Sequence, residues 1–84
     1  MNKPAVLIVD DEKSARDGLV RALRRDYRVF AAENGTSALE VLANQSIDVL
    51  LSDVRMPGMD GITLMQRALA NNPGLTVIIL TAYG

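Results

Sequence analysis

The stretch Ala5-Val6-Leu7-Ile8-Val9-Asp10-Asp11 is a run of apolar residues that ends in two acids. A continuous run rich in β-branched residues is typical of a strand buried on both faces of a sheet, so we predict a strand over 6–9. A second apolar run, 47–51, leads to Asp53, and a third, 75–80, ends in Thr81-Ala82 without an acid. If all three are parallel strands, their carboxyl ends meet at one sheet edge, where ligands of open α/β sheets bind.

The segments between these runs predict three helices. Apolar residues at helical spacing indicate a helix over 13–25. Its apolar stripe is predicted to consist of Ala15, Leu19, Ala22 and Leu23. Ser37 and Glu40 have the spacing of a capping box, so a second helix is expected to begin there and to end at 43 or 44. Asp60 is the expected N-cap of a third helix that ends at 69 or 70.

The order of these elements defines the fold class. Residues 27–32 form a weaker strand with more polar neighbours, which we place at an edge of the sheet. We attribute Gly18, inside the first helix, to close packing against the sheet, and we expect Asp48 to be a solvent-facing strand residue. The order β-α-β-α-β-α-β with short connections indicates an α/β fold with a parallel sheet. Residues 1–84 are one domain at most.

The composition excludes several classes of function. Nine basic and ten acidic residues give a net charge of −1, which offers no electrostatic case for binding nucleic acid or an anionic membrane. The chain has neither cysteine nor histidine, so disulfides, thiolate metal sites and histidine-dependent mechanisms are excluded. No apolar run has the length of a signal peptide's apolar region or of a membrane span, so a cytoplasmic protein is the expectation.

The three acids at the strand ends are the candidate site. Taken alone, an aspartate after a strand is more often an acid at a helix N-terminus, where the helix dipole stabilises it. Asp10, Asp11 and Asp53 together would repel one another, yet they suit a hard divalent cation such as Mg²⁺, which prefers oxygen ligands. One carboxylate near a bound cation can also act as a nucleophile toward a phosphoryl group.

Three segments of the chain resemble a known family. VLIVDDE at 6–12, LLSDVRMPGMDG at 50–61 and VIILTA at 77–82 are similar, in this order and spacing, to the receiver domain of two-component response regulators. The ending TAYG at 81–84 resembles the nitrogen-regulation-type enhancer-binding subclass. The resemblance implies a flavodoxin-like fold with strand order 2-1-3-4-5. This chain would then contain the order 2-1-3-4 as a single, C-terminally truncated domain that lacks the final α-β-α.

The resemblance also implies a role for individual residues. Asp53 would be the phosphoacceptor, taking a phosphoryl group from the phosphohistidine of a sensor histidine kinase or from a small donor such as acetyl phosphate. Asp11 and Asp53 would bind Mg²⁺ through their side chains, Asp10 through a coordinated water, and Arg55 through its backbone carbonyl. The implied activity is that of a signalling phosphoacceptor and not of an enzyme.

The end of the fourth strand supplies the remaining implied roles. Thr81 would hydrogen-bond the phosphoryl group and shift on phosphorylation, and Ala82 would leave room beside that group. The family also uses a lysine at the end of a fifth strand, for which the chain has no residue. Lys3 and Lys13 flank the first strand and are not assumed to replace it.

Other interpretations stay open. The chain is an inactive structural fragment if the absent lysine is essential. An aspartate-nucleophile phosphatase usually has a second Asp two residues after the nucleophile, where this chain has Arg55. A nucleotide-binding domain has no support, because no glycine-rich phosphate motif follows any strand.

The truncation itself predicts partners. Parts of the sheet surface over 6–9, 49–51 and 77–79 would be uncovered, and the fourth strand would be an open edge that invites pairing. We therefore expect a homo-oligomer or swapped dimer, or a missing segment supplied by another chain. We expect no direct contact with nucleic acid from this segment and no membrane contact.

Overall fold

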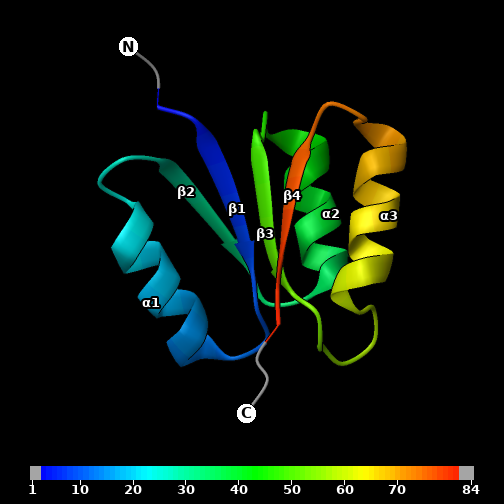
Figure 1. The fold of residues 1–84 in the computed structure, drawn as a ribbon, viewed down its shortest axis with the longest axis horizontal. Helices are drawn as coiled ribbons and strands as arrows, with labels where there is room; N and C mark the ends of the chain where they lie inside the picture. The colour runs from blue at the N-terminus through cyan, green and yellow to red at the C-terminus, as the bar shows by residue number, and fades with distance from the viewer. Residues whose placement is uncertain (1–2, 82–84) are drawn as a thin grey trace.

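The computed structural model describes residues 3–81 as one parallel sheet with helices on both faces (Figure 1). Its elements are β1 (Ala5–Val9), α1 (Lys13–Leu23), β2 (Arg28–Ala32), α2 (Gly35–Asn44), β3 (Val49–Asp53), α3 (Gly61–Asn71) and β4 (Thr76–Leu80). The strand order is β2-β1-β3-β4, and all neighbours are parallel. The predicted flavodoxin-like order and the edge position of β2 are therefore confirmed. None of the helices in this part of the chain is long and apolar enough to cross a membrane.

The central strand β1 separates two cores. All five of its residues are buried, as expected for a strand covered on both faces. Alternate side chains point to opposite faces. Leu7 therefore joins the larger core beneath α2 and α3, whereas Ile8 joins a smaller core beneath α1. Figure 1 shows this division, with α1 on one side of the sheet and α2 and α3 on the other.

The smaller core corrects two expectations about α1. Val20, with Leu19 and Leu23, packs against the sheet, whereas Ala15 and Ala22 are exposed, so the predicted stripe was wrong in part. A Cβ built on Gly18 meets no atom within 4 Å, so the explanation by close packing against the sheet was also wrong. Helical periodicity gives the spacing of a buried stripe, but the position of the sheet decides which residues face it. The helix ends at Leu23, earlier than expected.

The start of α2 differs from the predicted capping box. Asn34 is the N-cap, and its side-chain oxygen accepts a hydrogen bond of 2.8 Å from the backbone N–H of Ser37. The helix begins at Gly35, so Ser37 lies inside the first turn, and its prediction as the cap was wrong. Asn and Ser are both good N-caps. Asn34 is the cap here because its backbone is extended and its side chain reaches a free N–H of the first turn.

Asp60 caps α3 as predicted. Its side-chain oxygen accepts a hydrogen bond of 2.8 Å from the backbone N–H of Thr63. Hydrogen bonds from Thr63 lower the pKa of the Asp60 carboxyl below its ordinary value of 3.8. The helix runs to Asn71, slightly beyond the expected end.

The residues around β3 also differ from expectation. The strand begins at Val49 and includes Asp53 as its last residue, so it lies further along the chain than the predicted 47–51. Asp48 lies before the strand, and its carboxylate accepts a hydrogen bond of 2.8 Å from the backbone N–H of Ala5. Its prediction as a strand residue was therefore wrong, although Asp48 is exposed to solvent as expected. Asp48 instead ties the start of β3 to the start of β1.

The strand β4 has a neighbour on one side only within residues 3–81. Its residues Ile78 and Leu80 are 46% and 38% exposed. Ile78 is level with Leu51, which belongs to the core beneath α1, so this exposed surface lies on the α1 face beyond the reach of that helix. The expected uncovered surface is thus present at β4, whereas the expectation was wrong for 6–9 and for Leu50 and Leu51, which are buried.

The cap assignment of α2 predicts different effects for two alanine substitutions. Asn34→Ala removes the acceptor for the Ser37 amide and should lower the free energy of unfolding by about 1 kcal/mol. Ser37→Ala keeps its backbone N–H and should change it far less. Urea denaturation followed by circular dichroism measures both. A larger loss for Ser37→Ala than for Asn34→Ala would restore the capping box and contradict the assignment.

Candidate functional site

The register of the sheet brings the predicted acids to one edge. In the β1–β3 pair Val9 is level with Ser52, so Asp10 and Asp53 follow side by side at the carboxyl ends of these strands. The backbone N–H of Asp10 donates to the carbonyl of Ala32 at 3.2 Å, which extends the pairing with β2 beyond the strand. Both acids are therefore positioned by the main chain of their neighbours.

The three predicted acids form a cluster. One carboxylate oxygen from each of Asp10, Asp11 and Asp53 lies within 4.8 Å of the others. Asp10 is buried, Asp53 is half-buried and Asp11 is exposed, so the cluster opens toward solvent on one side. Oxygen ligands beside open space suit Mg²⁺, which keeps several of its waters. The donor set therefore fits a divalent cation of this kind.

The three carboxylates differ in the hydrogen bonds that they accept from the protein. Asp10 accepts a hydrogen bond of 2.9 Å from the backbone N–H of Glu12, the residue before α1. This bond closes an Asx turn, which fixes the chain between β1 and the N-cap of α1. The carboxylates of Asp11 and Asp53 accept no hydrogen bond from any residue in 3–81. They are the two that remain free for an incoming group.

The loop after β3 forms one wall beside the cluster. A shallow hollow there is lined by Asp11, Val54, Arg55, Met56, Pro57 and Asp60. Met56 is buried and anchors the loop, whereas Arg55 is exposed. Gly58 has a φ of 78°, a left-handed conformation that glycine adopts without strain. Arg55, the predicted backbone ligand, thus shares a hollow with Asp11.

The residues predicted around the phosphoryl position are only partly described. Thr81 follows Leu80, whose carbonyl accepts a hydrogen bond of 3.2 Å from the N–H of Val54. Thr81 is exposed and lies at the same sheet edge as Asp53. Ala82 lies outside the described residues.

Lys13 is engaged away from the cluster. Its ammonium forms an ion pair of 2.7 Å with Asp17 on α1. The hydrogen bond from Lys13 lowers the pKa of the Asp17 carboxyl.

Gly61 is a site residue that sequence reasoning missed. A Cβ built on it would overlap the carbonyl oxygen of Asp53 and lie 3.0 Å from the Cα of Val54. The backbone N–H of Gly61 donates to the carbonyl of Val54 at 2.9 Å. The start of α3 therefore rests directly on the main chain that carries Asp53. The pair Asp60-Gly61 at a helix start was the only local signal.

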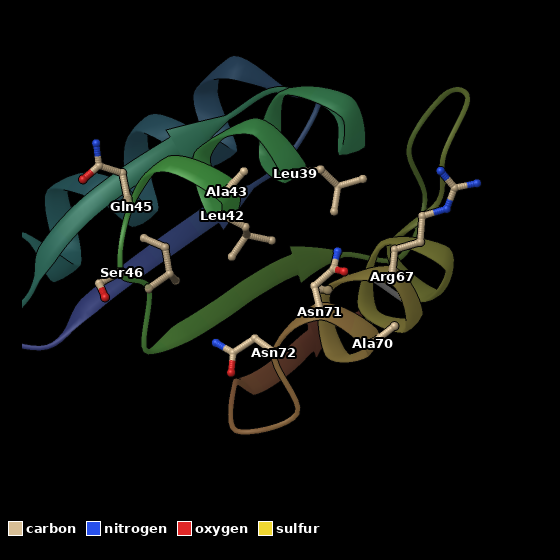
Figure 2. A pocket seen from close by; sticks show the side chains of 11 residues that line it. Leu39, Leu42, Ala43, Gln45, Ser46, Arg67, Ala70, Asn71 and Asn72 are labelled. Atoms are coloured by element: carbon tan, nitrogen blue, oxygen red, sulfur yellow. The ribbon is translucent and has the colours of Figure 1, made fainter.

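A separate hollow of about 750 Å³ lies between the C-terminal halves of α2 and α3. Figure 2 shows the labelled side chains of Leu39 and Leu42 from α2 and of Arg67, Asn71 and Asn72 around it. It lies near the amino ends of β3 and β4, away from the acids. None of its lining residues carries a carboxylate. This hollow therefore offers no acidic ligand for a cation.

Comparison with known proteins gives one family. The model of the response regulator receiver domain matches residues 6–84. The chain is 46% identical over 84 residues to the DNA-binding transcriptional regulator NtrC of Escherichia coli strain K12, covering 99% of this chain and 18% of that protein. It is 38% identical to the sporulation initiation phosphotransferase F of Bacillus subtilis, covering 100% of this chain and 68% of that protein.

Solved structures agree. The response regulator protein TrrA from Thermotoga maritima, in complex with Mg(2+)-BeF, superposes with a TM-score of 0.90 at 32% identity, over 96% of this chain and 71% of that one. A CheY-like receiver domain protein from Methanospirillum hungatei gives a TM-score of 0.93 at 28% identity, over 99% of this chain and 67% of that one.

The contact of Gly61 with Asp53 predicts a costly substitution. Gly61→Ala forces its methyl group against backbone and should lower the free energy of unfolding by about 1–3 kcal/mol. Gly18→Ala, where the methyl group meets nothing, is the control and should raise it by up to about 1 kcal/mol. Urea denaturation gives both values, and amide NMR shifts report on Asp53. A Gly61→Ala variant with unchanged stability and an unmoved Asp53 amide would contradict the contact.

Proposed function

This chain belongs to the response regulator receiver family, and from that membership we propose that it accepts a phosphoryl group on the carboxylate of Asp53. The observation that carries the proposal is the cluster of Asp10, Asp11 and Asp53 at the carboxyl edge of the sheet. Asp53 is half-buried at a strand end and accepts no hydrogen bond from residues 3–81, so a carboxylate oxygen is available as a nucleophile.

The transfer forms one bond and breaks one bond. A carboxylate oxygen of Asp53 attacks the phosphorus atom in line with the leaving group. When the donor is a phosphohistidine, the P–N bond breaks, its electron pair stays on the imidazole, and the imidazole takes up a proton from water. When the donor is acetyl phosphate, the P–O bond breaks and acetate leaves. Asp53 becomes an acyl phosphate in both cases.

The acids around Asp53 support a cation role. Asp11 and Asp53 are the proposed side-chain ligands of Mg²⁺, Asp10 acts through a water, and the carbonyl of Arg55 adds a backbone ligand. Asp10 suits the indirect role because one of its oxygens already accepts from Glu12. A bound Mg²⁺ would offset the negative charge on the phosphoryl oxygens during transfer.

The end of β4 completes the proposed site. The hydroxyl of Thr81 would donate a hydrogen bond to a phosphoryl oxygen, and Ala82 would lie beside the phosphoryl group. Such a contact biases the chain toward one of two conformations, which is how a local charge change becomes a signal.

The proposed donor is a sensor histidine kinase, since receiver domains are phosphorylated by such kinases. The chain spans 18% of the length of the NtrC relatives that it matches, so their activity as whole proteins is not carried over. We propose that residues 1–84 belong to a single receiver domain of the nitrogen-regulation type. With a net charge of −1, this segment is not expected to contact DNA itself.

The alternatives have less support. A phosphatase would need an acid near position 55, where the chain has an exposed arginine. An inactive structural fragment remains the second candidate, because no lysine of the described residues is placed at the cluster. Lys13, the basic residue that follows the acids most closely, is paired with Asp17.

Intact-mass analysis after incubation with acetyl phosphate tests the phosphoacceptor. The wild-type chain should gain a single phosphoryl adduct in the presence of Mg²⁺ and none without it. Asp53→Asn should gain none, because an amide is not a nucleophile of this kind. Asp26→Asn changes the net charge equally at an exposed position away from the cluster and should behave as wild type. Equal labelling of wild type and Asp53→Asn would contradict the assignment.

We also propose that two copies of the chain pair through β4. Edge strands are normally protected by charges, proline or bulges, and Thr76-Val77-Ile78-Ile79-Leu80 contains neither a charged residue nor a proline. Ile78 and Leu80 of this strand are exposed, so pairing about a two-fold axis would extend the sheet and place both side chains beside those of the second copy.

Light scattering coupled to size-exclusion chromatography tests the pairing. The wild-type chain should run as a dimer, and Ile78→Lys should shift it to a monomer by placing a charge on the edge strand. Ile62→Lys, at an exposed residue of α3 with 39% accessibility, is the matched control and should remain dimeric. A wild type that stays monomeric at every concentration, or equal effects of the two lysines, would contradict the pairing.

A further inference from the structure

One basic side chain reaches the turn that carries the first two acids. Nη1 of Arg16 donates a hydrogen bond of 2.8 Å to the backbone carbonyl of Asp10. Arg16 lies in the first turns of α1, where its own N–H donates to the carbonyl of Glu12 at 3.0 Å. Its side chain is half-buried and therefore extends back along the turn instead of into solvent.

This contact completes the anchoring of Asp10. The N–H of Asp10 donates to Ala32, its carbonyl accepts from Arg16, and its carboxylate accepts from the N–H of Glu12. All the polar groups of this residue except one carboxylate oxygen thus have partners within the described chain. Asp11, the next residue, has no such hold on its side chain and depends on the turn for its position.

We propose that Arg16 is a positioning residue for cation binding, because it fixes the Asp10-Asp11 turn against Asp53. The inference rests on the function proposed above and adds a residue that the motif of acids does not include. Three carboxylates within 4.8 Å of one another repel, and this repulsion pushes a loosely held turn away from β3. The bond from a guanidinium is charge-assisted and opposes that movement.

The affinity for the cation depends on the exact position of the Asp10-Asp11 turn. Mg²⁺ demands near-ideal octahedral geometry, so small displacements of its ligands weaken binding. Residues that orient metal ligands typically change metal affinity by about 10–100-fold when they are mutated. Arg16 would act in this way through the backbone of Asp10, without touching the cation.

Neighbouring basic residues do not share this contact. Lys13 is paired with Asp17, and Arg21 and Arg24 border a shallow hollow with Asp17 on α1. Arg21 is exposed and forms no hydrogen bond with the turn. It therefore supplies a control that removes the same charge from the same helix.

Titration with Mn²⁺ alone, followed by the electron paramagnetic resonance of the free ion, tests the inference on the 84-residue chain. Arg16→Ala should weaken Mn²⁺ binding by about 10–100-fold. Arg21→Ala should bind as wild type. Arg16→Lys keeps the charge and a donor on a shorter reach, so it should recover part of the affinity. Hydrogen exchange at the Glu12 amide, measured without cation, should speed up in Arg16→Ala and not in Arg21→Ala.

The outcomes distinguish a failure of the role proposed for Arg16 from a failure of the cation site itself. If wild type binds Mn²⁺, Asp11→Asn does not, and Arg16→Ala binds as tightly as Arg21→Ala, the role of Arg16 is overturned while the cation site stands. If wild type and Asp11→Asn bind alike, the cation site itself is overturned and the role of Arg16 with it. A loss of affinity in Arg16→Ala that Arg16→Lys partly restores supports the proposal even where the alanine variant is less stable.

Discussion

The register between β1 and β3 is the constraint on which the site depends. Because Val9 is level with Ser52, Asp10 and Asp53 leave their strands side by side. A slip of one residue would exchange the faces of a whole strand. Leu7 and Ile8 belong to different cores, so such a slip would disrupt both. The apolar packing of β1 therefore fixes the acids in place, although none of the core residues takes part in the chemistry.

The repulsion among three carboxylates at this edge lowers the stability of the fold. Hydrogen bonds and close contacts of the surrounding backbone hold the acids in place against that repulsion. Asp10 is 8% exposed and is held by the N–H of Glu12 and by its own main-chain bonds. Gly61 lets the start of α3 approach the carbonyl of Asp53, which holds the other side of the cluster. Because the backbone at Asp10 and Asp53 is fixed before the cation arrives, cation binding loses less ordering entropy, which is the advantage of preorganisation.

The local patterns of the sequence were enough for the carboxyl ends of β1, β2 and β4, the α/β order and the cap at Asp60, because each depends on neighbours along the chain. The same patterns failed where the role of a residue depends on a contact with a residue far away in the sequence. Asp48 bonds to Ala5, and Gly61 meets Asp53 only after the loop folds back. Val20 replaces the alanines on the inner face of α1 because the sheet sets the phase of that helix. The three acids were predictable because parallel strands bring their ends together without further information.

The free energy of unfolding as a function of Mg²⁺ concentration tests the central claim most directly. Without the cation, Asp11→Asn should be at least as stable as wild type, since it removes one of three repelling charges at an exposed position. At 100 times its dissociation constant, Mg²⁺ should stabilise wild type by about 2.7 kcal/mol and should stabilise Asp11→Asn far less. An equal gain in both proteins, or no gain in wild type, would contradict a cation site built from these three carboxylates.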